Sequence, residues 1–234
     1  MHATISILSH NASNYAAWCL DNLKLHTDSK NCRLLLTANG PDSVGVFEKF
    51  KEATPFIETT IIKNPENMGF IKPNREALCL TYEKQSDIFI MLNDDALVGP
   101  GWLDTIFSAF DKDPMLAVAG PSGSRLNDSF LGGQRGDPIE YVEGCCLAVR
   151  TSLAKRHGLF DPKLEWAYGE DSDLSLTFRS LGYQIKRLNF PFAHIGSVTT
   201  KSLRSAKASQ HFQENHKYLA QKWSDYLKTR EFKK

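Results

Sequence analysis

The chain has 234 residues, enough for one large domain or two small ones, and a net charge of +1. With a charge this close to zero, no bulk field favours binding to nucleic acid or to an anionic membrane. Hydrophobic residues make up 41% and charged residues 24%, as in ordinary soluble globular proteins, and no apolar run is long enough to form an integral membrane segment. Five cysteines without zinc-type spacing, and an amino terminus that enters a strand directly, predict a cytoplasmic protein without a signal peptide.

The first half of the chain alternates short apolar runs with helical patterns. Such alternation is typical of an α/β fold with a mainly parallel sheet, right-handed crossovers and helices on both faces. A GxGxxG motif after the first strand and a GxxxxGK[ST] motif are both missing, which disfavours a dinucleotide-binding fold and a P-loop. Strands are expected at residues 4–9, 33–38, 59–63 and 88–92, with helices between them.

The second half is less regular. The pattern predicts a long loop at residues 121–138, and loops of that length in compact domains are typical of lids and binding segments. The remaining elements expected are strands at 116–120, within 140–150, at 183–188 and at 192–194, and helices from residue 151, at 171–181 and from about residue 205.

The stretch IFIMLNDDALVGPGWL, residues 88–103, stands at the centre of this organisation. Its apolar run ends in Asn93, Asp94 and Asp95, at the strand end where open α/β sheets bind ligands. Adjacent carboxylates repel one another unless a cation, a basic group or solvent relieves them, and such oxygen ligands suit Mg²⁺ or Mn²⁺ on a substrate phosphate. The alternative is a solvated Asn-Asp turn that caps the next helix. His194, at the end of a short strand, is either structural or, if its strand returns to Asp95, a third metal ligand.

Polar clusters also follow the ends of the other predicted strands. Each cluster alone is typical of a turn. On one edge of a parallel sheet, however, they would form a crevice with acceptors for a base and a ribose beside the metal carboxylates. The clusters are Ser9-His10-Asn11, Asn39-Gly40 and Asn67-Met68-Gly69.

A second acidic cluster, WAYGEDSD, spans residues 166–173. Carboxylates before a helix can simply favour its positive end, and that is our interpretation of Asp173. The cluster also places two aromatic residues beside carboxylates, a possible wall for a sugar with a general base. A base here and a metal at Asp95 would divide a displacement at an anomeric carbon between them. The metal would stabilise the departing diphosphate, and the base would take a proton from the attacking hydroxyl.

Several segments resemble, in order and spacing, the signature of the family 2 glycosyltransferases of GT-A type, over nearly the whole chain. These segments are TISILSHN, NMGF with Asn74 further on, LNDDALVGPGWL, EGCCLAVR, GLFDPKL, GEDSDLSLTFRSLGYQI, AHIGS and FQENHKYLAQKW. The resemblance implies a Rossmann-like, mainly parallel central sheet with a less regular acceptor-binding half. It also implies an inverting enzyme that moves a sugar from a nucleoside diphosphate sugar to an acceptor.

The resemblance also implies roles by position. Asp171 would be the catalytic base, and Glu170 would bind the acceptor with Trp166 and Tyr168. The Mn²⁺ or Mg²⁺ ligands would be Asp95, Asp94 and His194. The nucleotide-sugar-binding residues would be Ser9, His10, Asn11, Asn39, Asn67, Gly69, Lys72, Asn74, Asn93 and Asp94.

The implied organisation is a nucleotide-sugar-binding half (residues 1–98), an acceptor-binding and catalytic half (99–204) and a C-terminal helix (205–234). The implied partners are a UDP-, dTDP- or GDP-sugar donor and a glycan or polysaccharide acceptor. Two departures from the family pattern, Ala38 for the usual aspartate and Asn93 at the first acidic position, keep open a catalytically inactive nucleotide-sugar-binding module. A nucleotidyltransferase on a similar sheet is the other alternative, although HNASNYAAW lacks the Gly-rich, basic loop expected of one.

Overall fold

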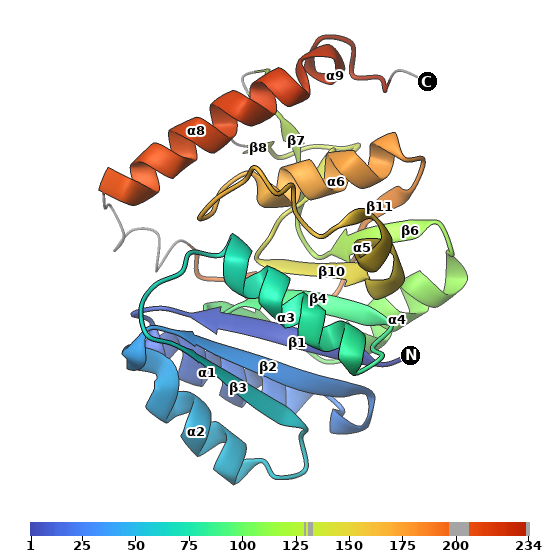
Figure 1. Ribbon diagram of the computed structural model, residues 1–234. Coiled ribbons are helices and arrows are strands. Elements are labelled where there is room, and N and C mark those ends of the chain that lie inside the picture. Colours follow the sequence, from blue (N-terminus) through green and yellow to red (C-terminus); the bar gives the residue numbers. More distant parts are fainter. Residues whose placement is uncertain (129, 131–132, 197–205, 233–234) are drawn as a thin grey trace.

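A seven-stranded sheet forms the centre of the computed structural model, which describes residues 1–128, 130, 133–196 and 206–232 (Figure 1). The strands lie in the order β11-β6-β10-β4-β1-β2-β3. β10 runs antiparallel to β4 and β6, and the other neighbours are parallel, so the predicted mainly parallel α/β sheet is confirmed. The strands are β1 (Ala3–Ser9), β2 (Cys32–Asn39), β3 (Thr59–Asn64), β4 (Ile88–Asn93), β6 (Leu116–Gly120), β10 (Cys146–Arg150) and β11 (Gln184–Arg187).

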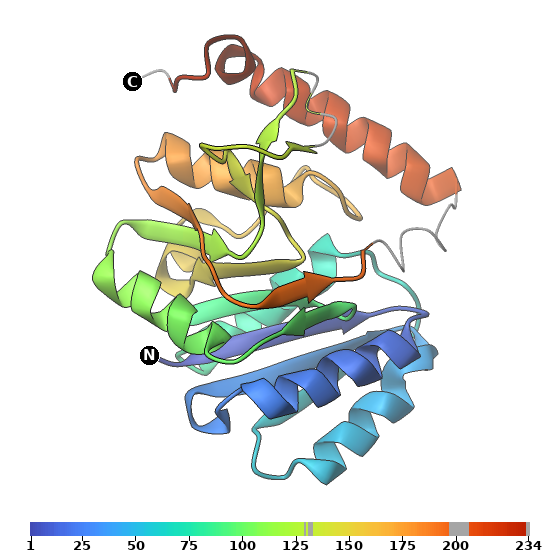
Figure 2. The same cartoon turned by 180° about the vertical axis from the view of Figure 1, so that it is seen from behind.

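Helices cover both faces of this sheet, as the two opposite views show (Figures 1 and 2). Successive side chains of a strand point to opposite faces, so a central strand must be apolar throughout. In β4, Ile88, Ile90 and Leu92 enter one core, while Phe89 and Met91 enter the other. The first core is closed by α1 (Ser13–His26), α2 (Val44–Ala53) and α4 (Trp102–Lys112), and the second by α3 (Ile71–Glu83), α5 (Thr151–His157), α6 (Glu170–Ser180), α8 (Ala206–Lys222) and α9 (Ser224–Thr229).

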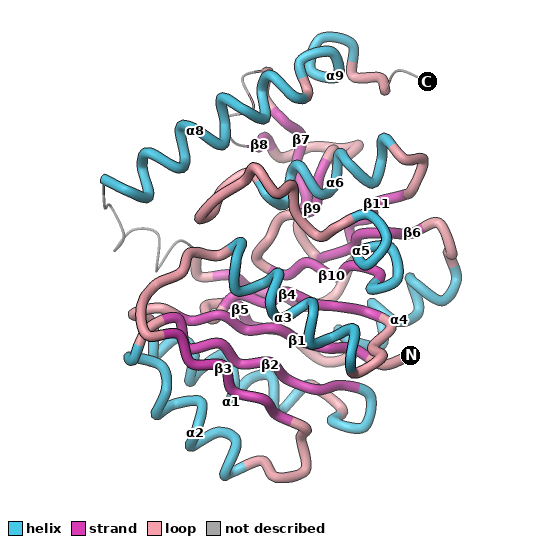
Figure 3. Tube along the Cα trace, in the orientation of Figure 1, coloured by secondary structure: helices cyan, strands magenta, loops and turns pink. Residues whose placement is uncertain are grey.

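The second half contains more strands than the sequence pattern indicates (Figure 3). The prediction of one long loop at residues 121–138 was wrong, since β7 and β8 lie within it, and β7 pairs with β8 on one side and with β9 on the other. Residues 129, 131 and 132 lie outside the described part. β7 and β8 are short and each begins with glycine, so neither shows an alternating apolar pattern and only their pairing identifies them. The strands outside the seven-stranded sheet are β5 (Ala96–Val98), β7 (Gly123–Leu126), β8 (Gly133–Gln134), β9 (Tyr141–Val142) and β12 (Phe192–His194), and of these β12 matches the strand expected at residues 192–194.

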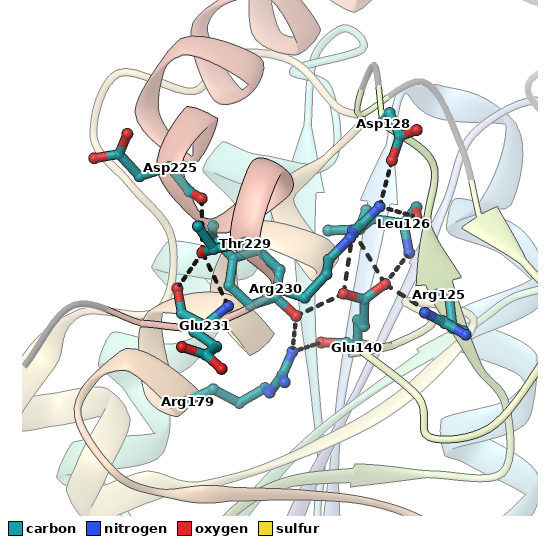
Figure 4. Close-up of polar contacts among 10 residues, drawn as sticks. Arg125, Leu126, Asp128, Glu140, Arg179, Asp225, Thr229, Arg230 and Glu231 are labelled. Carbon is teal, nitrogen blue, oxygen red and sulfur yellow. Dashed lines mark hydrogen bonds and ion pairs between the residues drawn. The ribbon is translucent and has the colours of Figure 1, made fainter.

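A buried polar cluster around Glu140 fixes α9 to this small sheet (Figure 4). The Tyr226 hydroxyl donates to Glu140 Oε1 at 2.6 Å and accepts from Arg179 of α6 at 2.8 Å. Arg230 Nη1 lies 3.2 Å from Glu140 Oε1, and the Leu126 N–H donates to Glu140 Oε2 at 2.8 Å. The carboxylate is 5% exposed, and these donors and the guanidinium compensate its desolvation. The cluster thereby joins α6, α9 and β7.

Candidate functional site

A cavity of about 410 Å³ lies at the edge of the sheet where the parallel strands β1, β2 and β4 end. Its walls also include the residues before β10, the segment 166–171 and the end of β12. The carboxyl edge of an open α/β sheet is where such folds bind their ligands, so this cavity is the candidate site.

Most residues that the sequence nominated line this cavity. Three do not. Ser9 is buried and accepts a hydrogen bond from Ser43 Oγ at 2.7 Å, whereas Asn11 and Lys72 are exposed. Ile71, the residue before Lys72 in α3, is buried. Because adjacent residues of a helix lie on different faces, Lys72 is exposed to solvent instead. The nominated residues in the lining are His10, Asn39, Asn67, Gly69, Asn74, Asn93, Asp94, Asp95, Trp166, Tyr168, Glu170, Asp171 and His194.

Asp95 and His194 form an ion pair on one wall of the cavity. β12 pairs with β5 so that His194 stands opposite Ala96, which returns the imidazole to Asp95. His194 Nε2 lies 3.0 Å from Asp95 Oδ1, and the Gly196 N–H donates to Asp95 Oδ2 at 3.1 Å. The hydrogen bond with Asp95, followed by the contact with the Cys145 thiol, raises the pKa of His194 to about 10. The return of the strand to Asp95, which the metal hypothesis requires, is therefore observed.

Asp94 does not join this pair. Its carboxylate bonds to the Ser9 hydroxyl on β1, and burial raises its pKa to about 7. Its Oδ2 has no hydrogen-bond partner among the described residues. Within the same described part, no three His, Cys, Asp or Glu side chains are arranged to hold a metal ion. The expected set of Asp94, Asp95 and His194 is thus not formed, because the two neighbouring carboxylates turn toward different strands.

Glu170 and Asp171 begin α6 and lie on another wall of the cavity. Asp171 Oδ2 accepts from the Gly144 N–H at 2.9 Å, and its Oδ1 accepts from the Ser172 N–H at 2.7 Å. Burial raises the pKa of Asp171, and burial followed by the charge of Asp171 raises the pKa of Glu170 to about 8. Glu170 Oε2 has no hydrogen-bond partner among the described residues. A carboxylate with a raised pKa is suited to accept a proton near neutral pH.

Asp173 is turned away from the cavity. It is 1% exposed, and its Oδ1 accepts from Lys222 Nζ and from Trp223 Nε1, both at 2.7 Å. Asp173 stands in the first turn of α6, and its side chain joins this turn to Lys222 at the end of α8 and to Trp223 directly after it. Because Lys222 also pairs with Asp161 Oδ2 at 2.7 Å, α8 is bound to residues at both ends of the segment that carries Glu170 and Asp171.

The side chain of Asn39 organises the opposite wall of the cavity. Its Nδ2 donates to Asn67 Oδ1 and to the Gly69 carbonyl, both at 2.9 Å, and its Oδ1 accepts from Asn64 Nδ2 at 3.1 Å and from the Met68 N–H at 2.9 Å. An amide offers two donors and two acceptor positions, so these bonds use its full capacity. Asn39 therefore shapes the loop after β3, an indirect role that strand-end position alone did not indicate.

Sequence reasoning missed Glu143 and Cys145, which also line the cavity. Glu143 Oε1 accepts from Ser124 Oγ at 2.6 Å, and the Cys145 carbonyl accepts from the Asn93 N–H at 3.0 Å. Their position along the chain could have indicated that they line the cavity. Because β10 runs antiparallel beside β4, the residues that precede β10 must lie next to the carboxyl end of β4.

We expect Glu170→Gln to stabilise the protein in alkaline solution relative to the wild type. Glu170 has a pKa of about 8 in the folded chain, above its ordinary value of 4.5, so its proton is lost on unfolding and stability falls as the pH rises through this interval. Glutamine stays neutral and avoids this loss. Melting temperatures at about pH 5 and about pH 8.5 test the effect, and an equal difference between variant and wild type at both pH values would contradict it.

No family model and no curated protein matches the chain in sequence. Comparison of structures finds a mannosyltransferase, PcManGT from Pyrobaculum calidifontis, in complex with GDP-Man and Mn²⁺ (16% identity, TM-score 0.62, 79% of this chain and 53% of that chain). It also finds GalNAc-T7 with UDP, GalNAc and Mn²⁺ (14% identity, TM-score 0.68, 83% of this chain and 44% of that chain). A third similar structure is S. aureus TarS 1–349 in complex with UDP-GlcNAc (14% identity, TM-score 0.58, 81% of this chain and 55% of that chain).

The chain spans about half the length of each of these solved structures. No helix in the described residues combines the length and apolar character needed to cross a bilayer. The seven-stranded mixed sheet, the covering helices and the three structural matches agree on one architecture, and the chain has the GT-A glycosyltransferase fold.

Proposed function

We propose that the chain is an inverting, metal-dependent glycosyltransferase that moves a sugar from a nucleoside diphosphate sugar to a hydroxyl of a glycan acceptor. One observation carries the proposal: a single cavity at the carboxyl edge of the sheet contains both the Asp95–His194 pair and the Glu170–Asp171 pair. The similar structures are complexes with GDP-Man and Mn²⁺, with UDP, GalNAc and Mn²⁺, and with UDP-GlcNAc, which supports a nucleotide sugar as the ligand class here.

The Asp95–His194 pair fits a divalent cation, Mn²⁺ or Mg²⁺. A carboxylate oxygen and an imidazole nitrogen are ligand types that Mn²⁺ accepts, and a cation here would displace the proton that lies between Asp95 Oδ1 and His194 Nε2, 3.0 Å apart. Both residues line the cavity. Two protein ligands are enough for a cation that is completed by water and substrate phosphates. Such a cation, when bound, neutralises the charge that develops on a departing diphosphate.

Asp171 would accept the proton of the attacking acceptor hydroxyl at its carboxylate. The Gly144 and Ser172 N–H groups hold this carboxylate in place, which reduces the reorganisation needed for proton transfer. Glu170, with an oxygen that lacks a partner among the described residues, would hold the acceptor. A base on the α6 wall and a leaving-group site on the β4–β12 wall are the arrangement that a single displacement with inversion requires.

The nucleotide end of the donor would lie along the walls formed after β1, β2 and β3. His10, Asn67, Gly69 and Asn74 line this part of the cavity and are proposed donor contacts. The hydrogen bonds that Asn39 makes to this loop hold the loop in place without a ligand. A preformed loop lowers the entropy cost of binding, which favours recognition of a rigid ligand such as a nucleotide.

Thermal unfolding with UDP-, GDP- and dTDP-sugars, each with Mn²⁺ or with EDTA, tests the proposal before any acceptor is known. A ligand at 100 times its Kd stabilises the folded state by about 2.7 kcal/mol, which corresponds to roughly 5–10 °C in Tm for a chain of this length. We expect such a shift for one nucleotide class, lost with EDTA. No shift with any donor contradicts the proposal, and a shift without release of nucleoside diphosphate favours the inactive binding module.

A further inference from the structure

Two bulky residues of the cavity wall adopt a backbone conformation that favours glycine. The φ angles of Trp166 and Tyr168 are +64° and +81°, both in the left-handed region. Glycine would occupy these positions without steric cost, so aromatic residues there indicate that the side chains themselves are needed. Both residues line the cavity. Some other part of the molecule must therefore hold the loop of residues 165–168 in its strained shape.

The start of α3 holds this loop from the donor side. The Trp166 carbonyl accepts from the Phe70 N–H at 2.6 Å and from the Ile71 N–H at 3.0 Å. These N–H groups begin a helix and have no partner within it, so the carbonyl supplies the acceptor that they need. Gly69, with φ +77°, permits the approach, because a Cβ there would lie 2.7 Å from the Trp166 carbonyl oxygen.

Asn215 of α8 holds the same loop from the opposite side. Its two Nδ2 hydrogens are shared among the carbonyls of Glu165 at 2.8 Å, Ala167 at 3.0 Å and Tyr168 at 3.3 Å, and its Oδ1 accepts from the Glu165 N–H at 3.4 Å. The side chain is 3% exposed, so water does not compete for these bonds. One buried amide thus binds the backbone on both sides of the left-handed Trp166.

The rings on α8 lie against the two aromatic residues of the loop. His211 stacks on Trp166 with the ring centroids 6.0 Å apart and an interplanar angle of 8°. Phe212 meets Tyr168 edge to face at 5.2 Å. The helix therefore supports the side chains as well as the backbone of the loop, but Asn215 is the residue whose hydrogen bonds select the backbone shape.

We propose that Asn215 is a positioning residue that holds residues 165–168 in the shape that presents Trp166 and Tyr168 to the acceptor. Asn215 acts through the loop, since it is not among the described residues that line the cavity. The acceptor part of this inference rests on the proposed glycosyltransferase function. Its structural part does not, because the hydrogen bonds to the loop exist without a ligand. When the loop is released, water reaches the donor sugar and the acceptor loses its wall, so hydrolysis replaces transfer.

The test uses the full chain with Asn215→Asp, which keeps the size of the side chain and removes its two N–H donors, and with Asn215→Ala. Tyr226→Phe is the control, because it removes hydroxyl bonds to Glu140 and Arg179 that anchor the C-terminal helices away from the loop. The Phe70 and Ile71 N–H groups donate to the Trp166 carbonyl, so their rates of hydrogen exchange measure how well this carbonyl is held in place. We expect exchange at least about 10-fold faster in both Asn215 variants and unchanged in the control and in β1.

The functional readout is the fate of the donor that the thermal screen identifies, with the methyl glycosides of glucose, galactose, mannose and N-acetylglucosamine as acceptor probes. In the Asn215 variants we expect donor affinity to be retained and the ratio of transfer to hydrolysis to fall about 10-fold, with a wild-type ratio in Tyr226→Phe. Unchanged exchange at Phe70 and Ile71, or a released loop with a wild-type ratio, overturns the inference. If the wild-type protein turns over no donor, the proposed function fails, and the exchange measurement still decides whether Asn215 holds the loop.

Discussion

Asp171→Asn is expected to lower sugar transfer by about 10²- to 10⁴-fold, the contribution of a positioned general base. The amide has the shape of the carboxylate but cannot take the proton of the attacking hydroxyl. Asparagine has one oxygen where Asp171 uses two, so either the Gly144 or the Ser172 N–H then faces an NH₂ group. Such a mismatch costs about 1–3 kcal/mol, which a folded chain of this size tolerates. Initial rates of nucleoside diphosphate release, with and without acceptor, measure the loss.

The matched control for Asp171→Asn is Glu143→Gln. Glu143 lines the same cavity and its carboxylate also raises the pKa of Asp171, so its replacement removes a neighbouring charge without touching the proposed base. Glutamine can still accept from Ser124 Oγ, as Glu143 does. We expect nucleotide affinity to be retained in both variants and transfer to be lost only in the first. Wild-type transfer by Asp171→Asn would make Glu170 the next candidate for the base.

Asp95→Ala is expected to abolish the dependence of nucleotide binding on Mn²⁺. Changes to residues around metal ligands cost 10- to 100-fold in metal affinity, so removal of a ligand should cost at least about 100-fold. Titration calorimetry of UDP and GDP, with Mn²⁺ and with EDTA, measures the effect. Asp94→Asn is the control, because burial raises the pKa of Asp94 to about 7 and asparagine resembles its protonated form. Mn²⁺ that still strengthens binding in Asp95→Ala, or no longer does so in Asp94→Asn, would place the cation elsewhere.

Asp95→Ala should also change the pH dependence of the stability of the fold. The hydrogen bond with Asp95 and the Cys145 contact raise the pKa of His194 from 6.5 to about 10, so their stabilisation is complete below about pH 6.5 and is lost as the pH rises through 10. Asp95→Ala should therefore lower the melting temperature most near pH 6. The metal-free protein is the sample for this measurement, because a bound cation would occupy the same two side chains.

Much of the fold follows from local sequence pattern. The residues of β4 from Ile88 to Leu92 pack alternately into one or the other of two apolar cores. Each of them must therefore be apolar, and the resulting unbroken apolar run makes the strand recognisable in the sequence. The turn residues after each strand mark the carboxyl edge of the sheet. Polar clusters were expected at this edge, and the cavity there is lined by Asp95, His194, Glu170 and Asp171, whose roles stay predictions.

The sequence by itself thus determined the α/β class, the positions of the first four strands along the chain and the strand ends that carry the polar residues. The order of the strands in the sheet came from the tertiary structure. Only the tertiary structure decided that Asp94 turns toward Ser9 while Asp95 turns toward His194, although the two aspartates are neighbours. It also decided that Asn215 binds the loop of residues 165–168, about 50 positions away in the chain. The physical reason is the range of the interactions: apolar periodicity is repeated within a few residues, whereas a hydrogen bond between distant segments leaves no local pattern and exists only once the sheet and helices have packed.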